Sequence, residues 1–170
     1  MAHIHDELLE VFWPSSEPVS TGGIRDRGLL ESAVARPFHS AFRVDAYPTV
    51  IEKGLALFHS LIANHPFADG NKRTAVTALE HFLLANGFVL GIPNSIMYNL
   101  ATRTASYRER HETHERSLAY LVSSTTELIV PMAQFKADIA SVPTLEGTYE
   151  AMLRLRTGIR RHRFNHLIGN

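Results

Sequence analysis

Two strongly apolar stretches joined by six residues restrict the fold of this chain more than any other feature. Residues 49–64 are TVIEKGLALFHSLIAN, and residues 71–86 are NKRTAVTALEHFLLAN. Apolar residues recur in both at the three- and four-residue spacing of an α-helix, and in the first they cover an unusually wide surface. We therefore expect two central helices, with the connection 65–70 held rigidly against the core.

The rest of the chain also favours helices. Apolar spacing predicts them over residues 5–13, 27–36, about 94–109, about 114–130 and within 145–163. Asp26 is placed to cap the helix that Pro37 stops, and Asn86-Gly87 to end the second central helix. Only the stretch 38–47, FHSAFRVDAY, has the alternation of a short hairpin. The sequence predicts an all-α fold, a helical bundle with a small β-hairpin flap.

The composition narrows the class of protein. A chain of 170 residues, 45% hydrophobic and 20% charged, suits one domain with a substantial core. No apolar run approaches the roughly 20 residues of a membrane span, and the first residues lack the basic and apolar segments of a signal peptide. The absence of cysteine excludes disulfides, thiolate zinc sites and a cysteine nucleophile. We expect a cytoplasmic protein without a membrane partner.

The segment HPFADGNKRT (65–74) carries the chemistry of the chain. The first amides of a helix lack partners within it and lie at the positive end of its dipole, so they favour an anion. Gly70 allows the backbone to approach a ligand closely, and Asn71 is a capping residue that could also donate to a phosphate oxygen. Lys72 adds a point charge and Arg73 a planar pair of donors. Together they predict an anion site of polyphosphate type.

Two more residues of this segment indicate group transfer. Asp69 would repel a phosphate unless a cation lay between them, and Mg²⁺ commonly takes carboxylate and phosphate oxygens together. His65, at the mouth of the loop, can accept a proton from a hydroxyl at neutral pH. Singly, such residues could merely cap a helix or face solvent, but together they predict phosphoryl or nucleotidyl transfer.

The segment HPFADGNKR (65–73) resembles the Fic motif, His-x-Phe-x-Asp/Glu-Gly-Asn-Gly/Lys-Arg, at every specified position. The blocks GIRDRGLLESAVARP (23–37) and YPTVIEKGLALFHSLIANHPF (47–67) also resemble Fic/Doc proteins, in particular the death-on-curing (Doc) branch. The likeness covers about residues 3 to 90. It implies a Fic/Doc helical bundle, and we expect a catalytic domain over 1–130 and a helical C-terminal extension with a basic tail over 131–170.

The resemblance implies a role for each motif position. His65 would be the general base, Asp69 would hold Mg²⁺, and Phe67 would anchor the loop in the core. The implied catalytic residues are His65, Asp69 and Arg73, and the implied nucleotide- and phosphate-binding residues are Gly70, Asn71, Lys72 and Arg73. The stretch 38–47 falls where the family has a flap that aligns the target polypeptide by strand addition. The flap positions implied to dock the target are Phe38, His39, Ser40, Ala41, Phe42 and Arg43.

Lys72 bears on which group is transferred. Family members with glycine there generally transfer AMP from ATP to a protein hydroxyl, whereas a lysine fills space that the outer phosphates would use. In the Doc branch this accompanies a reversed ATP whose γ-phosphate reaches the acceptor. Such proteins phosphorylate a translation factor, elongation factor Tu, and are toxins held in check by an antitoxin. The resemblance thus implies an ATP- and Mg²⁺-dependent protein kinase, while Gly70, which can be alanine in the best-known toxin pattern, leaves AMP transfer open.

Other features leave further alternatives. A catalytically silent regulatory or binding module is the alternative from a different class, and a homo-oligomer also stays open. Five arginines and no acid follow residue 151, which indicates either a solvated face or contact with an acidic antitoxin or nucleic acid, although we expect no nucleic-acid partner. Glu146-Gly147 narrowly misses the family's inhibitory Ser/Thr-x-x-x-Glu motif, because Val142 stands four places earlier. We therefore expect inhibition by a separate antitoxin.

Three further histidines and two tyrosines are interpreted as structural. His111 and His114 are three apart with no third ligand nearby, so we expect a polar helix junction rather than a metal site. His59 lies on the opposite side of its helix from His65 and is expected to be structural. Tyr98 and Tyr107 are expected to pack between helices.

Overall fold

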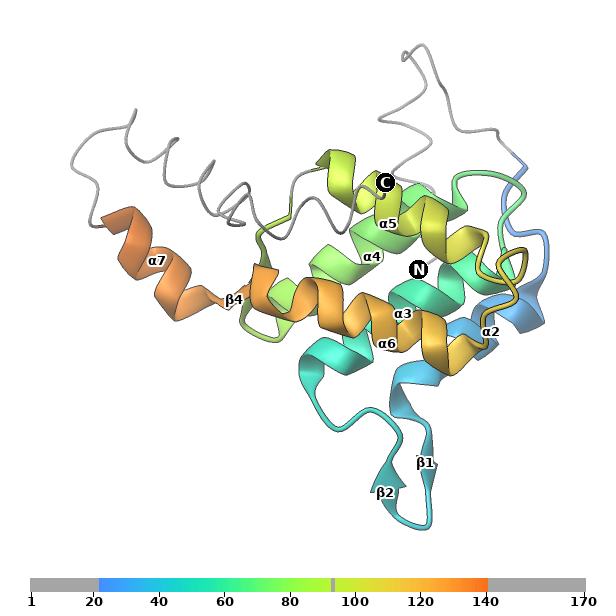
Figure 1. The fold of residues 1–170 in the computed structure, drawn as a ribbon, viewed down its shortest axis with the longest axis horizontal. Coiled ribbons are helices and arrows are strands. Elements are labelled where there is room, and N and C mark those ends of the chain that lie inside the picture. The colour runs from blue at the N-terminus through green and yellow to red at the C-terminus, as the bar shows by residue number, and fades with distance from the viewer. Residues whose placement is uncertain (1–21, 93, 141–170) are drawn as a thin grey trace.

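The computed structural model describes residues 22–92 and 94–140, and six helices and two small antiparallel sheets make up this part of the chain (Figure 1). The helices are α2 (Arg27–Ala35), α3 (Val50–Asn64), α4 (Asn71–Ala85), α5 (Asn94–Ala105), α6 (His114–Thr125) and α7 (Met132–Ala140). The strands are β1 (Ser40–Ala41), β2 (Val44–Asp45), β3 (Phe88–Leu90) and β4 (Ile129–Pro131), and short 3₁₀ helices span Arg36–Phe38 and Thr126–Leu128. The predicted mostly helical fold is confirmed.

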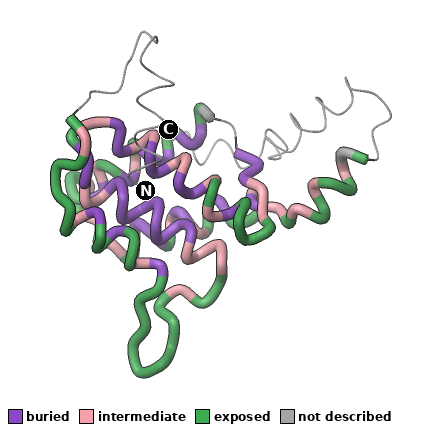
Figure 2. Tube along the Cα trace, turned by 180° about the vertical axis from the view of Figure 1, so that it is seen from behind, coloured by how far each residue is buried: buried purple, intermediate pink, exposed green. Residues whose placement is uncertain are grey.

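Helix α3 lies at the centre of the fold, as its apolar surface predicts. It begins with a capping box: the Thr49 hydroxyl accepts from the Glu52 amide at 3.1 Å, and the Glu52 carboxylate accepts from the Thr49 amide at 2.9 Å. Every residue from Gly54 to Ile62 is buried, and Figure 2 shows the buried residues gathered along the central helices. Gly54 permits close packing, because a Cβ there would lie 3.1 Å from the side chains of Leu79 and Phe82 on α4.

The segments before α3 follow the predicted pattern. Asp26 caps α2, with its Oδ1 accepting from the Leu29 amide at 3.0 Å, and the helix ends at Ala35. Strands β1 and β2 pair in the register Ser40↔Asp45 and Ala41↔Val44, so the predicted hairpin is confirmed. It projects from the helical body (Figure 1), and Phe42 at its tip is fully exposed with a φ of 52°.

The region after α4 departs from the prediction. The helix expected over 114–130 ends at Thr125, and β4 follows it and pairs with β3 in the register Phe88↔Pro131, Val89↔Val130 and Leu90↔Ile129. This sheet was missed because three-residue strands about forty residues apart show no periodicity. Likewise, α5 ends at Ala105 rather than near 109. Strand β4 spans the expected domain boundary at 130, which stays a prediction.

The expected helices over 5–13 and within 145–163 lie outside the described residues. So do Glu146-Gly147 and the arginines beyond residue 151.

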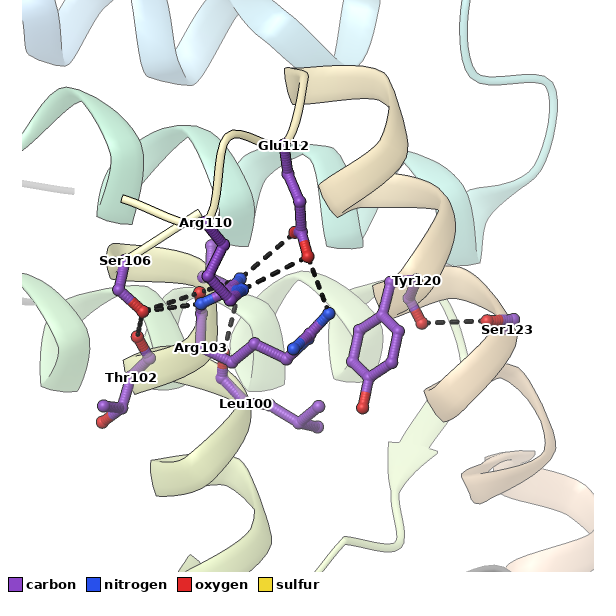
Figure 3. Close-up of polar contacts among 9 residues, drawn as sticks. Leu100, Thr102, Arg103, Ser106, Arg110, Glu112, Tyr120 and Ser123 are labelled. Atoms are coloured by element: carbon purple, nitrogen blue, oxygen red, sulfur yellow. Dashed lines mark hydrogen bonds and ion pairs between the residues drawn. The ribbon is translucent and has the colours of Figure 1, made fainter. Parts of the chain in front are cut away.

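A cluster of charged and polar side chains holds the turn 106–113 between α5 and α6 (Figure 3). This cluster, the Glu112 cluster, comprises Arg103, Ser106, Arg110 and Glu112. Arg103 Nη2 lies 2.9 Å from Glu112 Oε1, and Arg110 Nη2 lies 3.2 Å from Oε2. Arg110 also donates to Ser106 Oγ at 2.7 Å and to the Arg103 carbonyl at 2.7 Å. The hydrogen bond from Arg110, followed by the positive charges of both arginines, lowers the pKa of Glu112 despite partial burial.

His59 lies in the core beneath this turn, in keeping with its predicted structural role. It is fully buried, with its ring 5.2 Å from the ring of Tyr107 and 4.2 Å from that of His114. Burial, and then the positive charges of His114, Arg36 and Arg108, lower the pKa of His59 to about 3. Among residues 22–92 and 94–140 no three acidic, histidine or cysteine side chains are grouped to hold a metal ion.

Candidate active site

The loop 65–70 joins the end of α3 to the start of α4 through two residues in the left-handed conformation. His65 ends α3 with φ 52° and ψ 53°, and Gly70 precedes α4 with φ 72° and ψ 8°. Glycine adopts this conformation without strain, but a histidine does not, so the surrounding contacts must hold His65 in place. A non-glycine residue in this conformation is typical of a functional position.

The segment before α2 supplies one set of these contacts. The amides of Arg25 and Asp26 both donate to the Pro66 carbonyl, at 2.8 and 3.0 Å, and the Ala68 amide donates to the Gly23 carbonyl at 3.1 Å. An isolated antiparallel bridge joins Ile24 to Phe67. The loop is therefore fastened by backbone groups some forty residues away in sequence, which no local pattern announces.

Asn71 supplies the second set, from inside the loop. Its Oδ1 accepts from the Phe67 amide at 2.9 Å, its Nδ2 donates to the Phe67 carbonyl at 2.8 Å, and Nδ2 also lies 3.2 Å from His65 Nδ1. The side chain is buried. The expectation that Asn71 caps α4 is wrong, because Gly70 is the N-cap and the side-chain amide of Asn71 forms hydrogen bonds to the loop instead. Phe67 is 1% exposed and lies in the core, where the anchor was predicted.

His65 itself is exposed at the surface of the loop. Partial desolvation, then the positive charges of Arg25 and Lys72, lower its pKa, so the imidazole is neutral at pH 7. The two bonds to Phe67 fix which end of the Asn71 amide faces the ring, and that end is the donor. Nδ1 is then an acceptor, and the neutral ring carries its proton on Nε2.

The charged motif residues surround the start of α4. Asp69 Oδ1 accepts from the Gly70 amide at 2.6 Å; Asp69 is half-buried and Gly70 is buried. Lys72 and Arg73 lie half-buried in the first helical turn, where the amides of a helix are oriented toward an anion. The Lys72 ammonium lies 5.5 Å from the centre of the Tyr98 ring on α5. All of the predicted loop residues are thus brought together, with Tyr98 added by the fold.

Tyr98 was expected to pack between helices, and this is wrong. It is 63% exposed, whereas Ile96, Met97 and Leu100 around it in sequence are each about 3% exposed or less. Tyr107, in contrast, is buried as predicted. The sequence signal for a functional Tyr98 was an aromatic residue on the solvent side of an otherwise buried helical turn. Its partner Lys72 could not be identified without the fold.

An open, mostly apolar groove of about 580 Å³ lies along α2. Its lining residues are Ile24, Arg27, Leu30, Glu31, Val34, Ala35 and Phe38. Ile24, at one end of this lining, pairs with Phe67 of the loop, and Phe38, at the other end, is the first flap position. The flap positions 38–43 are all exposed.

Asp69 supplies the one carboxylate that this loop offers to a metal ion. A single carboxylate suits Mg²⁺ held jointly by the protein and phosphate oxygens, and does not suit a metal caged by protein ligands alone. The donor set therefore fits Mg²⁺ that arrives with a nucleotide.

Comparison with known proteins gives two matches. Residues 1–83 match the Fic/DOC family. The chain is also similar to a curated protein named Toxin Doc, from Mycolicibacterium smegmatis (strain ATCC 700084 / mc(2)155), with 45% identity over 86 residues. That alignment covers 47% of this chain and 66% of the relative. No solved structure matches the chain.

Proposed function

Because the chain belongs to the Fic/DOC family through its residues 1–83, we propose that it transfers the γ-phosphoryl group of ATP to a serine or threonine hydroxyl of a protein. The observation that carries the proposal is the loop 65–70, in which Asn71 and the segment 23–26 hold His65 beside the start of α4. A neutral base, a carboxylate and two basic residues at a helix N-terminus thus follow one another within nine residues, which supports a phosphoryl-transfer site.

The chain's own residues account for the steps of this reaction. The amides at the start of α4, with Arg73, bind and orient the phosphates. Asp69 would hold Mg²⁺, which neutralises phosphate charge when bound. The target hydroxyl loses its proton to His65 as its oxygen attacks the γ-phosphorus, and the bond from that phosphorus to the β,γ-bridging oxygen breaks, so that ADP leaves.

Proton transfer requires a free lone pair on the His65 ring. In the resting structure the lone pair is on Nδ1 and accepts from Asn71. A turn of the imidazole about Cβ–Cγ, or exchange of its proton with water, frees a ring nitrogen for the hydroxyl, and the exposed position of His65 permits either. Asn71 therefore fixes the resting ring, and its release precedes the chemistry.

The second candidate is transfer of AMP from the same nucleotide. It is left open by Gly70, because the best-known toxin pattern can carry alanine at this position. Lys72 favours the kinase, since an ammonium beside the helix start occupies space that a triphosphate in the AMP-transferring orientation would need.

The groove along α2 and the exposed flap offer a polypeptide target a surface on which to dock. By resemblance, the target is a translation factor similar to elongation factor Tu, and the protein is a toxin inhibited by a cognate antitoxin. None of the helices among the described residues is long and apolar enough to cross a membrane.

Labelled ATP tests the proposal. The purified protein is incubated with Mg²⁺ and a bacterial lysate, with ATP labelled in parallel at the γ- or the α-phosphate. We expect protein-bound γ label that is absent in His65→Ala, and a shift toward α label in Lys72→Gly. Wild-type α label would establish AMP transfer instead, and no label in a lysate freed of antitoxin would support a silent module.

A further inference from the structure

The contact between Lys72 and Tyr98 lies outside every role that the Fic motif gives to the loop. Tyr98 comes from α5, and its ring lies 5.5 Å from the Lys72 ammonium, within the range of a cation–π interaction. The ring is 63% exposed, so core packing does not explain it. An exposed aromatic that contacts one lysine of a proposed phosphate site is placed to act on that lysine.

The electrostatics of the helix start make such a partner useful. Lys72 is the second residue of α4, where the positive end of the helix dipole disfavours an ammonium. A lysine side chain also has four rotatable bonds, so it loses entropy whenever it is fixed by a ligand. The negative face of the Tyr98 ring offsets both costs, because it attracts the ammonium and restricts the chain before a ligand arrives.

We propose that Tyr98 is a positioning residue that holds the Lys72 ammonium beside, and not within, the anion site at the start of α4, where it meets a second phosphate of the bound nucleotide. This rests on the proposed function, because it assumes that the helix start binds the first phosphate. The site is thereby selective for a polyphosphate over a single phosphate: one phosphate occupies the helix start, and only a longer chain also reaches Lys72.

Calorimetry with inorganic phosphate and with tripolyphosphate tests the proposal without requiring turnover. The variants are Tyr98→Leu, Tyr98→Phe, Lys72→Met and the double variant Lys72→Met/Tyr98→Leu. We expect Tyr98→Leu to weaken tripolyphosphate binding about two- to five-fold, which corresponds to the usual strength of one exposed cation–π contact. Phosphate affinity should stay unchanged, Tyr98→Phe should bind like wild type, and Tyr98→Leu should have no effect once Lys72 is methionine.

Three results would overturn the proposal. They are an unchanged or higher tripolyphosphate affinity in Tyr98→Leu, an equal loss for phosphate and tripolyphosphate, and the same loss with Lys72→Met already present. A failure of the proposed function gives a different result. If tripolyphosphate binds with the expected coupling between Tyr98 and Lys72 but no label is transferred, only the proposed enzymatic activity is disproved. If the wild-type protein does not bind tripolyphosphate, both the proposed function and the proposed role of Tyr98 are disproved.

Discussion

The loop 65–70 and the turn 106–113 each connect two helices and each gather arginine or lysine at a helix end, but they use polar groups differently. In the turn, Arg103 and Arg110 both pair with Glu112, so two positive charges share one carboxylate within the protein (Figure 3). In the loop, Asn71 and the backbone of 23–26 hold the chain, and the Lys72 ammonium rests on an aromatic ring. The two arginines of the turn contact a carboxylate of the protein itself, whereas the loop is held by neutral groups and its Lys72 ammonium contacts an aromatic ring.

This contrast predicts that substitutions in the loop and in the turn separate activity from stability. His65→Ala should give the largest effect, a loss of transfer on the order of 10² to 10⁴, because it removes the base. The midpoint of thermal unfolding should change little, since His65 is exposed. Initial rates of labelling and a thermal melt measure the two quantities on the same sample.

His81→Ala is the matched control, because His81 is also exposed and lies on α4. It should retain the wild-type rate. A His65→Ala protein that unfolds at a much lower temperature would mean that the loop, like the turn, serves stability.

Phe67→Ala tests the contribution to stability of the loop residue that lies in the hydrophobic core. Phe67 is among the largest fully buried side chains, so its truncation should lower the free energy of unfolding by about 3 to 5 kcal/mol. Chemical denaturation measures the change. Phe42→Ala, at the exposed tip of the flap, should lie within about 0.5 kcal/mol of wild type, and a similar loss in both variants would contradict the anchor role.

The sequence predicted these two regions unequally, for physical reasons. Helix α3, its Thr49 cap and the residues of the loop follow from periodicity and from a contiguous motif, which depend only on neighbours in the chain. Three other features depend on groups about 25 to 45 residues apart. They are the backbone hydrogen bonds between residues 23–26 and the loop, the β3–β4 pair and the Lys72–Tyr98 contact. The predicted capping role of Asn71 is wrong, because capping and loop closure favour the same residue type.

His59 extends the comparison to the interior of α3, six residues before His65. Its pKa is lowered to about 3 in the folded protein against 6.5 unfolded, so the unfolded chain binds more protons below pH 6.5. Stability is therefore unaffected at pH 7 and falls as the pH drops below 6.5, by about 2 kcal/mol at pH 5 from this residue. Denaturant unfolding of wild type and His59→Met at pH 7.5, 6 and 5 measures it.

The His59→Met variant should be much less sensitive to pH over this window, in which few carboxylates titrate. His81→Gln should keep the wild-type sensitivity, because His81 is exposed. Parallel pH profiles for wild type and His59→Met would show that the buried ring is not the cause.

Glu112→Gln gives the smallest effect and tests the turn itself. The substitution keeps the shape of the side chain but removes the charge that Arg103 and Arg110 share, and the acid is only 16% exposed. We expect a loss on the order of 1 kcal/mol in the free energy of unfolding at pH 7. Because the folded pKa of Glu112 is lowered, this contribution is complete above its unfolded value and disappears as the pH falls through the folded one.

Glu31→Gln is the matched control for Glu112→Gln, since Glu31 pairs with Arg27 but both side chains are largely exposed. It should cost at most about 0.5 kcal/mol. Labelling rates should remain at the wild-type level in both variants, because neither touches the loop 65–70. A Glu112→Gln protein that melts normally but transfers no label would show that the turn acts on the loop through α5, where Arg103 and Tyr98 share one helix, and the two regions would then form one functional unit.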